Sequence, residues 1–345
     1  MQSLQPSFVI IRKNALDYPL GQKLYEHFSS NSSQQETELK IAPPRGRLPL
    51  DYDLPFTQKF HRAKRIILVS VRSVNKFQTC KPSAHYQLPL VSGCPGHCHY
   101  CYLSTNLGKN PYVKVYVNLE EIFERSQQYI DERKPKTTIF EGAATSDPLP
   151  VEKYTGSLAR AINFFADSNQ ARFRFVTKFT EIDSLLELQH NKHTEIRFSL
   201  NSKQIIDRYE PGTPPLDERI QAAVKTISAG YPTGLLLAPI FITKNWKQEY
   251  RQLLTSLTEH FPKHELKNLT LEIITHRYTE RAKKIINKAY PENKLPMEKE
   301  DRQFKYGQFG YGKYLYPKKQ RKKLEDFFTS EVNKQLPGAE IKYFI

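Results

Sequence analysis

Short runs of strand-forming residues alternate with helical patterns along this 345-residue chain, and this alternation restricts its possible folds more than any other feature. Most of these runs are too short for helices and are rich in β-branched or aromatic residues. The predicted strands are residues 87–92, 137–141, 172–177, 195–200, 234–240 and 269–275. Six strands separated by helical segments predict parallel β/α units.

Two segments between or after these strands have the apolar spacing of helices. Residues 119–132 form one of them, with Asn118 and Glu121 resembling a capping pair at its start. Residues 279–289 form the other, with Thr279 as a possible cap. The N-terminal Val9-Ile10-Ile11 run predicts a small strand with a helix after it.

The strand count predicts an α/β fold, a partial (β/α)6 barrel, rather than a complete eight-fold barrel of about 250 residues. A doubly wound open sheet is the alternative. We expect three regions: residues 1–75 as an N-terminal extension, 76–290 as the barrel and 291–345 as a basic, aromatic C-terminal segment that contacts DNA. Ligands of either fold bind at the carboxyl ends of the strands.

The net charge is +16, from 52 Lys and Arg against 36 Asp and Glu, which favours a polyanionic partner. Residues 276–325 contain 15 of these cations against 6 acidic residues, interleaved with tyrosines and phenylalanines. Cations for phosphates beside flat rings for bases are typical of a nucleic-acid surface. No stretch approaches the roughly 20 apolar residues of a membrane helix, and no signal peptide is recognisable, so we expect a cytoplasmic protein.

Three of the four cysteines, Cys94, Cys98 and Cys101, lie within eight positions in a C-x3-C-x2-C loop after the first predicted strand. Three thiolates are one too few for a closed zinc site or a fully ligated four-iron cluster. The spacing favours a four-iron cluster with one open iron over a disulfide or unreactive thiols. A zinc site would need a fourth ligand, which could be His97, His99 or Cys80.

Together with Tyr100, the cysteine loop resembles the radical S-adenosylmethionine superfamily motif, C-x3-C-x-aromatic-C. The resemblance extends to one family, spore photoproduct lyase, through motifs that follow one another from about residue 60 onward. They are FQTCKPSAHYQLPLVSGCPGHCHYCYLSTNLGKNPYVKVYVN, FEGAATSDP, RFVTKF, FSLNS, YEPGT, LAPI, ITHRYT and GYGKYLY.

This resemblance implies a radical-SAM partial barrel with a [4Fe-4S] cluster on Cys94, Cys98 and Cys101. It also implies a lyase that uses a 5′-deoxyadenosyl radical, made from S-adenosyl-L-methionine, to repair a UV-induced thymine lesion in DNA. An electron donor such as flavodoxin or ferredoxin and a monomeric state are expected. The residues expected to contact S-adenosylmethionine are Ser146, Lys178, Ser199 and Asn201, and the expected catalytic residues are Tyr100 and Tyr102.

The chain also departs from the family's pattern. The family's segment F-E-A-A-C-T-S-D contains a hydrogen-donating cysteine, where this chain has Ala144. Where the family has W-G-R-Y-G, residues 306–310 of this chain read Y-G-Q-F-G, with Gln308 and Phe309 in place of the arginine and the tyrosine. Cys80, the one cysteine outside the loop, is expected to be a small buried thiol. Two alternatives therefore stay open: a diverged radical enzyme for another lesion or modified base, and a catalytically silent, cluster-bearing DNA-binding protein.

Overall fold

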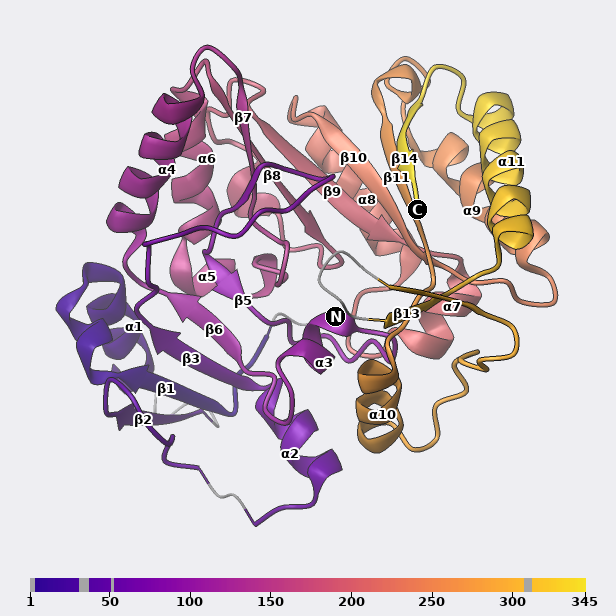
Figure 1. Ribbon diagram of the computed structural model, residues 1–345. Coiled ribbons are helices and arrows are strands. Elements are labelled where there is room, and N and C mark those ends of the chain that lie inside the picture. The colour runs from indigo at the N-terminus through magenta and orange to yellow at the C-terminus, as the bar shows by residue number, and fades with distance from the viewer. Residues whose placement is uncertain (1–3, 31–36, 51–52, 307–311) are drawn as a thin grey trace. The chain divides into compact units, whose positions relative to one another are not determined.

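Parallel strands dominate the computed structural model, which describes residues 4–30, 37–50, 53–306 and 312–345 (Figure 1). The described chain divides into two compact units. Unit 1 comprises residues 1–95, 107–177 and 181–195, and unit 2 comprises residues 96–106, 178–180 and 196–345.

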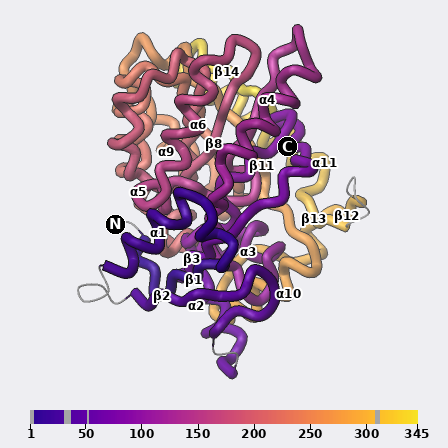
Figure 2. Tube along the Cα trace, turned by 90° about the vertical axis from the view of Figure 1, so that its left-hand side faces the viewer, coloured from indigo at the N-terminus to yellow at the C-terminus, as the bar shows by residue number. Residues whose placement is uncertain are grey.

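Unit 1 contains a five-stranded sheet near the N-terminus (Figure 2). Its order is β2 (Glu38–Ala42), β1 (Phe8–Arg12), β3 (Ile66–Ser70), β6 (Val113–Tyr116) and β5 (Val91–Ser92). Its strands pair in parallel except β5, which runs antiparallel to β6. The predicted N-terminal strand and helix are confirmed as β1 and α1 (Pro19–Ser30).

A second sheet has seven strands in nearly sequential order. The order is β14 (Glu340–Phe344), β11 (Thr270–Thr275), β10 (Thr233–Ile240), β9 (Thr194–Leu200), β8 (Ala171–Thr177), β7 (Thr138–Glu141) and β4 (Tyr86–Gln87). In this sheet the strand pairs within each unit run parallel, as in β7–β8 and β10–β11. A doubly wound sheet would reverse its strand order partway, and this one does not. The predicted α/β partial barrel is confirmed.

The first predicted strand, residues 87–92, is wrong as a single element. It is two short strands, β4 in the seven-stranded sheet and β5 in the five-stranded sheet. Pro89 lies between them and has no N–H for a strand ladder. The chain turns there, with the Leu90 N–H donating to the Leu88 carbonyl at 3.0 Å.

The helices flank these strands along the chain. Those of unit 1 are α1, α2 (Phe56–Ala63), α4 (Leu119–Arg133), α5 (Glu152–Thr155) and α6 (Ser157–Ala166). Those of unit 2 are α3 (Tyr102–Asn106), α7 (Lys203–Tyr209), α8 (Leu216–Ser228), α9 (Trp246–His260), α10 (Glu280–Ala289) and α11 (Lys318–Gln335). Short 3₁₀ helices are η1 (Lys13–Asp17), η2 (Leu149–Val151), η3 (Asp183–Leu185) and η4 (Leu266–Asn268).

The helix caps bear out the sequence pattern in one case of two. Thr279 caps α10, and its side chain accepts a hydrogen bond from the Ala282 N–H. Asn118 is the N-cap of α4, but its side chain makes no capping bond within the described chain. It binds the Glu121 carboxylate at 2.8 Å and the Arg72 backbone instead. That side chain therefore links α4 to the end of β3.

Each unit has an apolar core between helix and sheet. In unit 1, alternate residues of β8 are buried, and Phe173 stacks on Phe165 of α6 with 5.4 Å between ring centroids. In unit 2, Phe328 of α11 packs against Tyr250 of α9 and Phe344 of β14, with 5.2 Å and 6.3 Å between ring centroids. Among the described helices, none combines the length and hydropathy needed to cross a bilayer.

Candidate active site

The cysteine loop enters unit 2 at Gly96 and is fixed there by backbone hydrogen bonds. The His97 N–H donates to the Pro211 carbonyl and the His99 N–H to the Tyr209 carbonyl, each at 2.9 Å. Gly212 has a φ of +74°, and a Cβ there would lie 3.2 Å from the His97 ring. The YEPGT segment therefore supports the loop directly.

Two of the three loop cysteines belong to unit 2. Cys98 is buried and Cys101 partly exposed, and a turn joins them through the Cys101 N–H and the Cys98 carbonyl at 3.2 Å. The Ser104 hydroxyl approaches Cys101 Sγ at 3.5 Å from the first turns of α3. Burial first, and then the Glu210 charge, raise the pKa of the Cys98 thiol to about 12.

Cys94 belongs to unit 1 and follows a constrained glycine. Gly93 has a φ of +88°, and a Cβ there would meet the Tyr112 carbonyl oxygen at 2.3 Å. Gly93 bridges to Ser146, which is 4% exposed. The buried Lys64 ammonium donates to the Cys94 carbonyl at 3.1 Å. The predicted Ser146 thus lies beside the first residue of the cysteine loop.

The chemistry of the donor set fits a cluster of iron and sulfur. None of the four cysteines, all described, forms a disulfide. Thiols are the ligands of such clusters, and they lose their protons on binding metal. Within the described residues, no three His, Cys, Asp or Glu side chains stand in a ready metal-binding group. The assignment to Cys94, Cys98 and Cys101 stays a prediction.

Unit 2 brings Lys178 and Ser199, both predicted cofactor contacts, together. The Lys178 ammonium donates to Ser199 Oγ at 2.7 Å and lies 3.4 Å from Glu210 Oε1. Ser199 lies near the end of β9, and Lys178 begins the short segment after β8. Strand ends therefore supply the pair, as expected for this fold.

Glu210 is the centre of a buried ionic cluster that the sequence analysis did not identify. Its carboxylate lies 2.7 Å from the Arg219 guanidinium, and both side chains are fully buried. Burial alone would raise the Glu210 pKa, but Lys178 and Arg219 outweigh it and hold the pKa below its ordinary value. The Glu210 carboxylate therefore keeps its charge at neutral pH.

Arg219 also positions Ser199. Its guanidinium donates to the Ser199 carbonyl at 3.0 Å and to the Pro214 carbonyl at 2.8 Å. A third bond, at 2.8 Å, goes to Thr213 Oγ1. One side chain on α8 thus joins the end of β9 to the loop after Glu210.

The two predicted catalytic tyrosines differ in environment. The Tyr100 hydroxyl is buried and donates to Glu210 Oε1. Burial first, and then the Glu210 charge, raise the Tyr100 pKa well above its usual value, so the phenol stays neutral. Tyr102 is 60% exposed at the start of α3. Of the two, Tyr102 is the more accessible to a ligand.

Asn201, the fourth predicted cofactor contact, is fully buried and used by the fold. Its amide donates to the Pro239 carbonyl at 2.7 Å. Its oxygen accepts from the Ser202 N–H at 2.9 Å and the Tyr250 hydroxyl at 3.1 Å. A cofactor contact at Asn201 would compete with these bonds, and the contact stays a prediction.

Cys80 and Ala144 lie in segments of unit 1 that share one buried carboxylate. Cys80 closes a turn with Ala84 and is partly exposed, so the expectation of a buried thiol is wrong. Ser83 in this turn donates to Glu141 Oε2 at 2.9 Å, and the Ala143 N–H donates to Glu141 Oε1 at 3.1 Å. Glu141 is 2% exposed and ends β7.

An aromatic hairpin of unit 2 carries part of the basic C-terminal segment. Strands β12 (Gln303–Tyr306) and β13 (Gly312–Leu315) pair antiparallel. Phe304 and Tyr306 are 47% and 73% exposed. Gln308 and Phe309, where the sequence differs from the family's pattern, lie outside the described residues.

Replacing Glu210 by glutamine should lower the free energy of unfolding by about 3–5 kcal/mol. The change leaves two cations, one fully buried, without their counter-charge, and breaking a buried ion pair costs about this much. Urea unfolding of the metal-free protein measures the effect.

A matched control is Asp207→Asn on α7, which breaks an exposed pair with Lys203 at 3.0 Å. Exposed pairs contribute about 0–1 kcal/mol, so this variant should unfold almost as the wild type does. Equal effects of the two substitutions would show that the Glu210 cluster does not stabilise the fold.

Comparison with known proteins shows one family whose model matches almost the whole chain. The family model for spore photoproduct lyase matches residues 4–345. The spore photoproduct lyase of Clostridium acetobutylicum is 46% identical over 337 residues, covering 98% of both chains. That of Bacillus subtilis is 41% identical over 344 residues, also covering 98% of each.

Solved structures give the same result. A spore photoproduct lyase complexed with dinucleoside spore photoproduct matches with a TM-score of 0.95 at 39% identity, covering all of both chains. A variant of the enzyme bound to AdoMet and the same dinucleoside matches with a TM-score of 0.95 at 40% identity over both full chains. That variant has alanine in place of a cysteine and, 64 positions earlier, cysteine in place of a serine.

Proposed function

Because the chain belongs to the spore photoproduct lyase family, we propose that it repairs spore photoproduct, a thymine lesion in DNA, by radical chemistry. The match to a solved lyase holding the dinucleoside lesion, at a TM-score of 0.95 over both full chains, carries the proposal. A cytoplasmic location, a monomeric state and a flavodoxin or ferredoxin as electron donor are parts of the same proposal, supported by the family alone.

The cysteine loop would hold a [4Fe-4S] cluster through Cys94, Cys98 and Cys101, and one iron would stay open for S-adenosylmethionine. When bound, this pair supplies the 5′-deoxyadenosyl radical that attacks the lesion. Lys178 and Ser199 offer a cation and a hydroxyl at strand ends, which suit the carboxylate and hydroxyls of the cofactor. We assign Ser146 and Asn201 to the same cofactor.

The cluster around Glu210 holds this polar pair in place. Its charge fixes the Lys178 ammonium, and Arg219 holds the backbone of Ser199. The buried Tyr100 hydroxyl donates to the Glu210 carboxylate, whereas the Tyr102 side chain is 60% exposed. We therefore assign hydrogen transfer to Tyr102 and positioning to Tyr100.

Hydrogen return to the product requires a thiol that Ala144 cannot supply, and we assign this step to Cys80. Cys80 precedes Ala144 by 64 positions, the spacing of the two substitutions in the matched AdoMet-bound variant. Both segments donate hydrogen bonds to the Glu141 carboxylate, one from the Ser83 hydroxyl and one from the Ala143 N–H. In the step, the Cys80 S–H bond breaks, a C–H bond forms on the thymine radical, and Sγ keeps the unpaired electron.

Replacing Cys80 by alanine should reduce repaired thymine to a minor product while 5′-deoxyadenosine still forms, because radical generation does not need this thiol. Product analysis of the anaerobic, reduced, reconstituted protein with the dinucleoside lesion measures both. In the wild type the same assay tests the proposed chemistry: absence of 5′-deoxyadenosine from protein with an intact cluster would contradict it.

The double variant Cys80→Ala with Ala144→Cys is the matched rescue, since it moves the thiol to the position used by the relatives. It should restore repaired thymine. A Cys80→Ala variant that yields as much repaired thymine as the wild type would remove Cys80 from the mechanism and leave the radical chemistry intact.

A further inference from the structure

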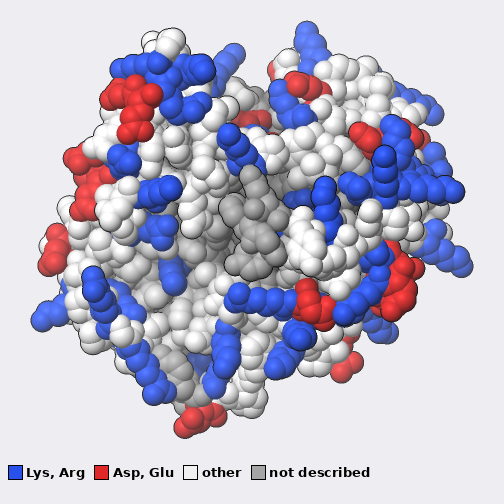
Figure 3. Space-filling model, viewed as in Figure 1, with Lys and Arg blue, Asp and Glu red and all other residues white. Residues whose placement is uncertain are grey.

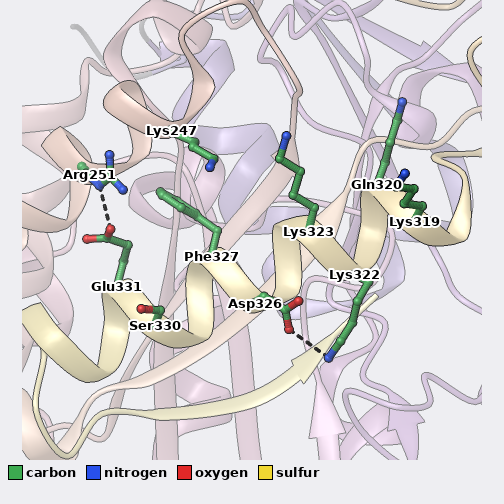
Figure 4. Close-up of a pocket in the computed structure, with 10 residues that line it drawn as sticks. All are labelled: Lys247, Arg251, Lys319, Gln320, Lys322, Lys323, Asp326, Phe327, Ser330 and Glu331. Carbon is green, nitrogen blue, oxygen red and sulfur yellow. Dashed lines mark hydrogen bonds and ion pairs between the residues drawn. The ribbon is translucent and has the colours of Figure 1, made fainter.

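Helices α9 and α11 of unit 2 line an open groove of about 750 Å³ (Figure 4). Lys247 and Arg251 contribute cations from α9, and Lys319, Lys322 and Lys323 contribute them from α11. Two acidic side chains, Asp326 and Glu331, also line it. Lys and Arg side chains gather over α11 on the molecular surface (Figure 3).

Both acidic side chains of the groove are already paired. Glu331 lies 2.6 Å from Arg251, and Asp326 lies 2.9 Å from Lys322. The other three cations, Lys247, Lys319 and Lys323, form no ion pair with a described residue. The groove therefore presents three uncompensated positive charges.

Two of these three charges, Lys319 and Lys323, lie close together on one helix. Lys319 and Lys323 are four residues apart on α11, where side chains are neighbours and like charges repel. The first turn of α11 contains no acidic residue. Phe327 meets Trp246 edge to face at 4.7 Å, which fixes α11 against α9. A polyanion lying in the groove would relieve the repulsion.

The groove is connected to the aromatic hairpin by a short, anchored segment. Two residues separate β13 from α11, and one of them, Tyr316, is 4% exposed. The Ile242 N–H donates to the Tyr316 hydroxyl at 3.1 Å, and the Arg302 guanidinium stacks on its ring at 3.8 Å. The exposed rings of Phe304 and Tyr306 thus lie on a hairpin that is joined to α11 by only two residues, one of them anchored.

We propose that this groove binds backbone phosphates of duplex DNA outside the lesion, so that α9 and α11 hold the flanking duplex. The inference rests on the proposed function for its ligand class. A groove lined by three cations outside any ion pair among the described residues is suited to a nucleic-acid backbone, which binds by releasing counterions.

Replacing Lys247, Lys319 and Lys323 together by alanine should weaken binding of an undamaged 20-base-pair duplex about tenfold or more. It should also lower the slope of log affinity against log salt by about 2 to 3, because each lost phosphate contact contributes about 0.9. Fluorescence anisotropy over a salt series measures both. Lys322 and Arg251 stay in place because they pair the two acids.

The matched control removes three exposed lysines of unit 1: Lys13→Ala, Lys109→Ala and Lys136→Ala. It has the same net charge as the groove variant and should bind the duplex nearly as the wild type does. Equal losses in the two variants, or no loss in the groove variant, would overturn the inference.

Turnover of the dinucleoside lesion separates this inference from the proposed function. The dinucleoside has no flanking duplex, so the groove variant should convert it at the wild-type rate, which also shows that the variant is folded. A wild type that binds duplex through the groove but leaves the lesion intact would refute the proposed function alone. A groove variant that loses dinucleoside turnover as well would overturn the separate role of the groove.

Discussion

Replacing Cys98 by serine should reduce the iron content of the reconstituted protein from about four atoms per chain to less than about one. Cys98 is buried, and a serine hydroxyl is a poor substitute for the thiolates that hold iron–sulfur clusters. With two of three ligands left, a cluster would lose its attachment at one iron. Iron and acid-labile sulfide analysis measures the change without any assay of activity.

Cys80→Ser is the matched control for that variant. Cys80 lies outside the loop and should leave iron and sulfide at their wild-type values. Full iron in the Cys98 variant, or equal loss in both variants, would contradict the ligand assignment. Zinc in place of iron in the purified wild type would favour the alternative in which His97, His99 or Cys80 completes a zinc site.

The strand runs of the large sheet could be predicted because each is a local pattern. Residues 172–177 alternate between buried and partly exposed positions in β8, as a strand facing a core should. The run at 87–92 failed because Pro89 ends the ladder, and apolar content alone did not reveal that break. The capping hydrogen bond of Thr279 lies within its own helix, so the local sequence could predict it. The Asn118 side chain instead binds the backbone of Arg72, which is distant in sequence.

The ionic cluster could not be predicted because its members are far apart in sequence. Glu210 meets Lys178 across 32 positions, and Arg219 reaches the Ser199 carbonyl across 20. The YEPGT motif contains Glu210, so the resemblance marked the segment but gave this residue no role. No sequence pattern marked Arg219 as buried, because an arginine on a helix is ordinarily exposed.

The nearness of the Cys80 and Ala144 segments in the fold could not be predicted from the sequence. The missing thiol at Ala144 was visible in the sequence, but no local pattern relates position 80 to position 144. The parallel pairing of β4 with β7 brings the two segments to Glu141, and only the folded chain contains that pairing.

The most direct test of the central claim is the fate of dinucleoside spore photoproduct incubated anaerobically with the reconstituted, reduced protein and S-adenosylmethionine. Mass spectrometry of the products, with a thymine cyclobutane dimer as the comparison substrate, should show unlinked thymidines from spore photoproduct only. Spore photoproduct that stays intact while S-adenosylmethionine is cleaved would contradict the account in favour of another substrate. An intact lesion with no 5′-deoxyadenosine, despite a complete cluster, would contradict it in favour of a silent DNA-binding protein.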